Sequence, residues 1–506
     1  MINSVRSFLA KHNIGIIVAF GAVLRTLGIF SRPIWYDEAF ALLFSSTGLA
    51  GMLQGTLALD STGQVSDIHP LGYYLLLDGW TDLFGVSVWR ARLLSIILGT
   101  LTLLLVYALS KFFVAEDQRW VLLLAVVLSP FSVHYSQEIR MYALMCLGLV
   151  LATYALFRGS AENGWRWWVA FAAASALAQY AHQLSAVYLV CLALIPVFQQ
   201  DWRTTWKAVL GGLGAVLLYL PWLLNLIAQF SSTSIYWVQK PLPSRFLTLF
   251  LAFTAGLPVF NGWLLVGFGA AMVLLVFALL ASVRIIRHAA PEEKSGFWLV
   301  YLALTPPAVL WLISQVRPVF IERALLASSL MFALWIGWLI THRLTPRIER
   351  VIMAVVFGVG ALIGFGHHLG NRQFPYAPYQ SLGSELAETV SEGEVIVHSN
   401  KLSFVPMYYY FRDDIPQTFV ADPDGQATDT LAVPTQEILG FIESPSIELA
   451  AGDANGVWFL IFDQSIKEAE ELAGIEHPNL QWLDQHYLLE DAKLWDSLWV
   501  MHYIKE

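Results

Sequence analysis

The chain has 506 residues, of which 57% are hydrophobic and only 13% are charged, and its formal net charge is −9. Ordinary soluble domains carry about 25% charged residues, so this composition excludes a soluble protein and indicates many membrane segments. The acidic balance gives no basic surface for nucleic acid, and the two cysteines, both in apolar runs, provide no disulfide framework.

Apolar stretches long enough to cross a bilayer, about 20 residues each, recur through the first 370 residues. We predict about eleven spans, near 14–32, 89–110, 119–135, 141–158, 166–181, 184–199, 207–228, 262–283, 296–315, 323–341 and 351–368. Two shorter apolar stretches, 69–84 and 245–258, are expected to be interfacial or re-entrant helices.

Basic residues orient these spans. With a cytoplasmic N-terminus, one side carries Arg6, Lys11, Lys111, Arg119, Arg158, Arg166, Arg203, Lys207, Arg284, Arg287, Lys294, Arg343, Arg347 and Arg350. Cytoplasmic loops carry an excess of Lys and Arg. The pattern therefore predicts a multi-pass protein of the plasma (inner) membrane whose polar clusters, together with everything after residue 370, face the extracytoplasmic side.

The composition changes near residue 375. A helical, acidic stretch at 384–388 alternates with short β-like runs at 394–398 and 457–462. Such alternation is typical of an α/β domain. We therefore predict a mainly α membrane domain at 1–374 and a small extracytoplasmic α/β domain at 375–506. The chain contains no solenoid repeat and no nucleotide-binding glycine loop.

Two adjacent carboxylates, Asp37 and Glu38, follow the first span directly. Carboxylates beside a bilayer are costly unless they are hydrated or paired. The plain interpretation is an acidic hydrated loop; the functional one is a general base that takes a proton from an acceptor. Neighbouring side chains on a helix point in different directions, so we expect only one of the two to face a substrate.

A second polar cluster runs from Asp67 through His69-Pro70 to Tyr73 and Tyr74. An acid or histidine before proline is a good helix start, so a capped interfacial helix explains His69 at least as well as catalysis does. Tyr73 and Tyr74 could equally be aromatic residues of the membrane interface. Asp67, His69 and Tyr73 are kept as candidate substrate-binding residues.

A third cluster, at the outer start of the fourth span, contains Glu138, Arg140 and Tyr142. Glu138 and Tyr142 are four residues apart, so we expect them to share a helix face. Glu138 and Arg140 could pair with each other, yet an arginine at this depth is also suited to a lipid phosphate, whose oxygens match its fork.

Further basic residues are predicted on the extracytoplasmic side. Lys240 ends a loop, and Arg323 lies inside an apolar run, where snorkelling to the interface explains it poorly. We expect Arg323 to contact a phosphate and Arg25, within the first span, to be paired in the interior. His69, His134 and His182 fall on the same side, but no ligand spacing supports a divalent metal site, which stays open only as an alternative.

The motifs Trp-x-Asp-Glu-Ala at 35–39, His-Pro-Leu-x-Tyr-Tyr at 69–74 and Gln-Glu-x-Arg-Met-Tyr at 137–142 resemble those of the GT-C glycosyltransferases. Within these the chain is most similar to the branch related to protein O-mannosyltransferases and lipid A aminoarabinose transferases. The resemblance covers roughly residues 14–370. It departs from the family pattern at Leu71, where a second proline is usual, and at Ala324, where tyrosine is common.

The resemblance implies an inverting hexosyl- or pentosyltransferase of the cell envelope, with a polyprenyl-phosphate sugar donor, an outward-facing site, an undefined acceptor and no required cofactor. By position, Asp37 matches the catalytic base and Glu38 its supporting acid, while Arg140 and Arg323 match positions that could hold the donor phosphate. A transporter or flippase of lipid-linked saccharides is the alternative, but it would place charges near the bilayer midplane between repeated halves. A membrane scaffold or receptor would treat the acids as incidental.

Overall fold

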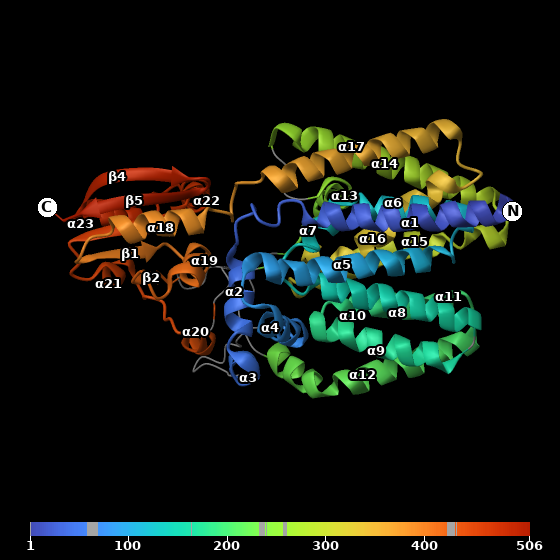
Figure 1. The fold of residues 1–506 in the computed structure, drawn as a ribbon, viewed down its shortest axis with the longest axis horizontal. Helices are drawn as coiled ribbons and strands as arrows, with labels where there is room; N and C mark the ends of the chain where they lie inside the picture. The colour runs from blue at the N-terminus through green and yellow to red at the C-terminus, as the bar shows by residue number, and fades with distance from the viewer. Residues whose placement is uncertain are drawn as a thin grey trace.

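The structure is a computed structural model that describes residues 2–57, 69–162, 164–231, 238, 240–256, 261–421, 431 and 433–505. For residues 2–13, 224, 226–231, 261, 472 and 473 it describes the backbone alone. Figure 1 shows a long helical bundle with the N-terminus at one end and a smaller part containing a sheet beyond the opposite end.

The bundle is built from helices that run along its length (Figure 1). In chain order they are α1 (Ile2–Thr26), α5 (Val88–Ser110), α6 (Arg119–Val127), α7 (Pro130–Tyr135), α8 (Tyr142–Glu162), α9 (Trp165–Ala181), α10 (Ser185–Ala193), α11 (Ile195–Phe198), α12 (Trp202–Ser231), α13 (Arg245–Ala255), α14 (Asn261–His288), α15 (Phe297–Ser314), α16 (Leu326–Thr341) and α17 (Arg347–Gly370). In the described part of this bundle, short 3-10 turns precede α6, α15 and α16: Glu116–Gln118, Pro291–Lys294 and Glu322–Leu325.

Among the described residues, seven helical segments are long and apolar enough to cross a membrane. They begin at Val88, Tyr142, Trp202, Gly262, Pro291, Glu322 and Arg347. The other predicted spans correspond to shorter or broken helices. The stretch 119–135 is divided by Pro130 into α6 and α7, because proline lacks the N–H that would continue the helical ladder. These helices confirm the predicted membrane character. Helix length and composition do not test the number of eleven spans, which stays a prediction.

Three short helices, α2 (Tyr36–Ser45), α3 (Gly48–Leu57) and α4 (Gly72–Phe84), lie at the end of the bundle nearest the sheet. In Figure 1, α2 and α3 run across the bundle axis rather than along it. Every residue of α2 is buried. Gly72, at the start of α4, approaches α9 so closely that an added Cβ would lie 2.5 Å from the Tyr180 carbonyl oxygen, and this contact holds the His-Pro motif beside α9.

The C-terminal part contains one five-stranded sheet in the order β2-β1-β3-β5-β4. Its strands are β1 (Glu394–His398), β2 (Gln417–Phe419), β3 (Gly456–Phe462), β4 (Leu488–Trp495) and β5 (Leu498–Ile504). β1 pairs in parallel with β2 and β3, and β5 is antiparallel to both β3 and β4. The helices around it are α18 (Tyr379–Thr389), α19 (Lys401–Phe411), α20 (Val433–Leu439), α21 (Ile447–Ala451), α22 (Asp463–Glu468), a π-helical turn at Ala469–Ala473 and α23 (Pro478–His486).

The sheet-containing part packs directly on the helices that cross the end of the bundle. α19 lies against α2, and α20 lies against α3, where the Thr435 hydroxyl donates a hydrogen bond of 3.1 Å to the Gly55 carbonyl. Buried side chains of α18 and α19 belong to the same apolar core as those of α2. The C-terminal part therefore forms the cover over α2, the helix that carries the acid pair.

Candidate functional site

Asp37 lies near the start of α2, with its carboxylate enclosed by two arginines. Arg323 donates from Nη1 to Oδ2 over 2.7 Å, and Arg140 Nε lies 3.6 Å from the same oxygen. The residue is 8% exposed. Burial would raise the pKa of Asp37, but Arg140 and Arg323 outweigh burial and hold the pKa below its usual range.

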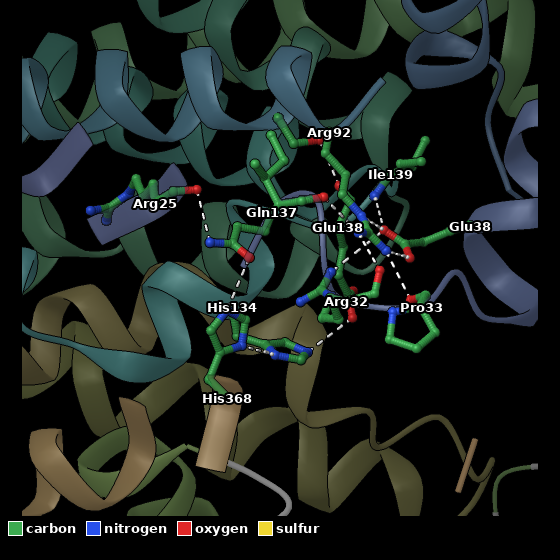
Figure 2. A network of polar contacts seen from close by, with 12 residues as sticks. Arg25, Arg32, Pro33, Glu38, Arg92, His134, Gln137, Glu138, Ile139 and His368 are labelled. Carbon is green, nitrogen blue, oxygen red and sulfur yellow. Dashed lines mark hydrogen bonds and ion pairs between the residues drawn. The ribbon is translucent and has the colours of Figure 1, made fainter. Parts of the chain in front are cut away.

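Glu38 points away from Asp37 and is fully buried. Arg92 of α5 binds it with two hydrogen bonds, Nε to Oε1 at 2.9 Å and Nη2 to Oε2 at 2.6 Å (Figure 2). The backbone N–H of Ile139 donates to Oε1 over 3.2 Å. Burial would raise the pKa of Glu38, yet Arg92 and Arg32 keep it lowered. Glu38 therefore joins three chain segments and has partners that differ from those of Asp37, while the expectation that only one acid of the pair faces a substrate stays a prediction.

Arg92 also fixes the loop before α2, because it donates to the backbone carbonyls of Ile29, Arg32 and Pro33 at 2.8–3.2 Å. The sequence reasoning missed this residue. Its signal was a cation inside an apolar run, the same signal that singled out Arg323 and Arg25. Arg25 is buried and bonded to the hydroxyls of Ser132 and Ser136, so the expected interior pairing is met by hydroxyls rather than by a carboxylate.

Glu138 takes part in a chain of polar contacts at the end of α7. His134 Nε2 lies 2.9 Å from Glu138 Oε1, His134 Nδ1 lies 3.1 Å from His368 Nδ1, and His368 Nε2 lies 2.9 Å from Gln137 Oε1 (Figure 2).

The expectation that Glu138 and Tyr142 share a helix face is wrong, because residues 136–141 form a turn and α8 begins at Tyr142. The Ile139 N–H that would continue the helix is given to Glu38 instead.

Tyr142, Tyr73 and Tyr74 are all buried, so an interfacial belt does not explain them. Tyr142 lies beside the arginine pair, with its ring centre 5.4 Å from the Arg323 guanidinium carbon. Tyr74 accepts from Arg140 over 3.4 Å, and Tyr73 shares a hydrogen bond of 3.2 Å with Ser95. Tyr74 and Tyr142 thus contact the arginines that hold Asp37, from α4 and α8, whereas Tyr73 contacts Ser95 of α5.

A large apolar cavity of about 780 Å³ opens beside this cluster, between α9, α10 and α12. Most of its wall is aliphatic, while His69, His182, Gln183 and Arg317 stand among its lining residues. The rings of His69 and His182 lie 5.5 Å apart, and the ring of Tyr142 is 5.9 Å from that of His182. His69 is near enough to Asp37 to lower the pKa of that carboxyl further. The polar residues of the cavity therefore adjoin the cluster around Asp37.

One further predicted residue, Lys240, falls outside this cluster. Lys240 is exposed, and no hydrogen bond or ion pair joins it to the other candidate residues that the structure describes. Asp67 lies outside the described residues. Within the described part of the chain, no group of three or more His, Cys, Asp or Glu side chains is arranged to hold a metal ion.

The fold is that of the GT-C membrane glycosyltransferases, as the motifs indicated. A family model described as dolichyl-phosphate-mannose-protein mannosyltransferase matches residues 68–227, which include the His-Pro cluster and the turn with Glu138 and Arg140. No curated protein sequence matches the chain.

Two solved structures illustrate the shared fold. ArnT from Cupriavidus metallidurans, bound to undecaprenyl phosphate, superposes with a TM-score of 0.61 at 12% identity over 97% of each chain. The oligosaccharyltransferase from Archaeoglobus fulgidus, tethered to an acceptor peptide, gives a TM-score of 0.55 at 10% identity, covering 99% of this chain and 74% of its own. At such identities the likeness shows the architecture, including the C-terminal part, and not the substrates.

Proposed function

We propose that the chain is an inverting glycosyltransferase that moves a sugar from a polyprenyl-phosphate donor to an extracytoplasmic acceptor, with Asp37 as the general base. One observation carries this proposal: a buried carboxylate held by Arg140 and Arg323 stands next to a large apolar cavity at one end of a GT-C bundle. A transporter would need its charges near the bilayer midplane, whereas Asp37 belongs to α2, at the end of the bundle on which the C-terminal part packs.

The apolar cavity suits a prenyl chain. Its aliphatic wall would bury the lipid, and each buried methylene contributes roughly 0.8 kcal/mol. Arg317, His69 and His182 would then meet the polar end of the lipid. ArnT, whose structure holds undecaprenyl phosphate, supports this class of donor.

The arginine pair links donor binding to the base. Guanidinium groups bind phosphate oxygens well, because the fork matches them with two parallel hydrogen bonds. A donor phosphate at Arg140 and Arg323 would share these cations with Asp37. The pKa of Asp37 would then rise from its lowered value, and the carboxylate would become a better base only when donor is present.

The chemistry then needs one proton acceptor and a stabilised leaving group. Asp37 takes the proton from an acceptor hydroxyl or amine, whose freed electron pair forms the bond to the anomeric carbon. The bond between that carbon and the phosphate oxygen breaks, and polyprenyl phosphate leaves with the electron pair. Arg140 and Arg323 stabilise the charge that develops on it.

The proposal is tested with the purified full chain in detergent, by following transfer of radiolabelled sugar from polyprenyl-phosphate donors to membrane extracts as the acceptor source. Transfer from at least one such donor, with release of polyprenyl phosphate, is the expected result. Sugar transfer from nucleotide sugars alone would contradict the donor class.

Replacing Arg323 by glutamine should weaken donor use and move the pH dependence. The KM for donor should rise about tenfold or more, since a charge-assisted contact to phosphate is worth roughly 1.5–3 kcal/mol. Because Arg323 lowers the pKa of Asp37, its loss should shift the acidic limb of kcat/KM to higher pH. Arg245→Gln is the matched control, because Arg245 pairs with Glu322 at the surface. An unchanged pH limb in Arg323→Gln would exclude Asp37 as the titrating group.

Sidedness can be measured with single cysteines. Cys146 and Cys191 are both buried, so they give little background with a membrane-impermeant maleimide. A cysteine at Asp453, in the sheet-containing part, should be labelled on intact cells. A cysteine at Arg287, at the far end of α14, should be labelled only after lysis. The reverse pattern would place the acid pair and the C-terminal part in the cytoplasm.

A further inference from the structure

A second cavity system, with lining residues different from those of the apolar cavity, lies between the bundle and the C-terminal part. One cavity of about 350 Å³ is bordered by the loop at 30–34 and by α18, and a second of about 660 Å³ by α2, the start of α5 and the end of α19. Phe30, Arg32, Gln380 and Tyr410 line both, so the two adjoin.

Arg32 is the notable residue of this system. Its side chain is only 7% exposed, and one nitrogen, Nη2, makes a long contact of 3.5 Å with Glu38. Its Nε and Nη1 atoms are buried and have no hydrogen-bond partner among the described residues. A buried donor without a partner costs about 1–3 kcal/mol, and more when the group is charged. Two such donors on one guanidinium, beside an open cavity, indicate a place for an anion with paired oxygens.

The surroundings indicate what kind of molecule carries that anion. Phe30 is 80% exposed and stacks near Trp89 with ring centres 5.8 Å apart, and Val86 is also exposed beside them. All three line the larger cavity, at the bundle end where α5 begins (Figure 1). Aromatic side chains at a membrane boundary are suited to the region of lipid head groups.

The charges are arranged along the cavity. Arg372 donates to the Ser31 carbonyl over 3.5 Å and lines the smaller cavity near Arg32. Asp413 and Asp414 stand at the rim of the larger cavity and are exposed, with Asp413 paired to Arg412. Arg32 itself lies near the carboxylates of Glu38 and Glu138, and Arg372 adds a cation on the side of the smaller cavity.

We infer that this junction binds the phosphate of an anionic phospholipid, with Arg32 as its main ligand and the acyl chains along Phe30, Val86 and Trp89. The site differs from the donor site around Asp37. Leu42 and Ser46, which line it, follow Glu38 at intervals of four residues on α2, so they share the Glu38 face rather than the Asp37 face. The inference stands whether or not the proposed transfer reaction is correct.

The test measures lipid binding to the full chain in a neutral detergent. Phosphatidylglycerol and phosphatidylcholine are titrated separately, and binding is followed by native mass spectrometry and by the midpoint of thermal unfolding, which a ligand of the folded state raises. Wild type should bind phosphatidylglycerol at least tenfold more tightly than phosphatidylcholine. Equal binding of the two lipids would overturn the inference.

Two variants locate the site. Arg32→Gln should reduce the preference for phosphatidylglycerol at least tenfold. Gln380→Glu, of nearly the same size, places a carboxylate beside both cavities without altering Arg32 or Glu38, and should reduce it as well. If Arg32→Gln does not fold, the lipid preference of Gln380→Glu alone tests the inference. Arg90→Gln is the matched control, since Arg90 is a cation of the same region that lines neither cavity and lies over the Trp89 ring.

A third arm separates a lipid from a soluble anion. Inorganic phosphate and glycerol 1-phosphate are added at millimolar concentration in place of lipid. Little stabilisation by either supports a lipid ligand, because the acyl contacts are then required. Stabilisation equal to that by phosphatidylglycerol would replace the lipid with a free phosphate ligand. If Arg90→Gln also lost the preference for phosphatidylglycerol over phosphatidylcholine, that preference would reflect general surface charge, and the inference would be overturned.

Discussion

Asp37→Asn should abolish most sugar transfer while the protein still folds. Asparagine has nearly the same volume as aspartate but cannot take the acceptor proton, and loss of a general base costs roughly 10²–10⁴ in rate. The amide still offers an oxygen to Arg323 and Arg140, so both arginines keep a partner. The measurement is the initial rate of transfer from a polyprenyl-phosphate donor, at saturating donor and at several pH values.

Two comparisons make this result interpretable. Asp37→Glu keeps a carboxylate and should retain more activity than Asp37→Asn at every pH, although the longer side chain disturbs the contact with Arg323. Size-exclusion profiles and unfolding midpoints of the three proteins should agree closely. If Asp37→Asn transfers sugar as fast as wild type, another group is the base and the proposed mechanism is wrong.

Arg92→Met should have its largest effect on folding rather than on chemistry. The change leaves Glu38 as a buried carboxylate without its two-bond partner, and it removes donors from the carbonyls of Ile29, Arg32 and Pro33. Breaking a buried ion pair by removing one partner costs about 3–5 kcal/mol. The expected result is a marked fall in the unfolding midpoint and in the yield of monodisperse protein.

A double variant separates lost pairing from lost volume. In Glu38→Gln with Arg92→Met the uncompensated charge is gone, so part of the stability should return. Arg90→Met, two residues away on α5, loses only its contact over the Trp89 ring and should stay near wild type. Equal stability of Arg92→Met and Arg90→Met would show that the Glu38 pair does not hold this end of the bundle.

Local patterns in the sequence were sufficient for the membrane character and for two strands of the sheet. The strand predicted at 394–398 has those bounds in the structure, and the one at 457–462 extends over Gly456–Phe462. Both are runs of β-branched and aromatic residues that are buried on the sheet. β4 was missed because all but one of its residues are exposed, so it lacks the apolar alternation that marks a half-buried strand.

The candidate site depends on contacts that no local pattern contains. Arg323 and Asp37 are 286 residues apart, and Arg92 and Glu38 are 54 apart. The sequence showed that Arg323 was in an unusual place, but not which carboxylate it would meet, and Arg92 was not singled out. The turn at 136–141 was mistaken for helix for the same reason, since a distant side chain, Glu38, takes the Ile139 N–H. Arg32 was not recognised because its significance lies in the cavity around it.

The burial of α2 beneath α19 also bears on how the protein is assembled during synthesis. α2 ends at Ser45, whereas α19 begins at Lys401. At about 5–20 residues per second, roughly 20–70 s separate the appearance of the two helices. Throughout that interval the apolar outer face of α2 has no cover. The helix that carries Asp37 can therefore reach its final environment only after nearly the whole polypeptide has been made, so a truncated product would expose an uncovered apolar helix to the cell's quality-control proteases rather than act as a partial enzyme.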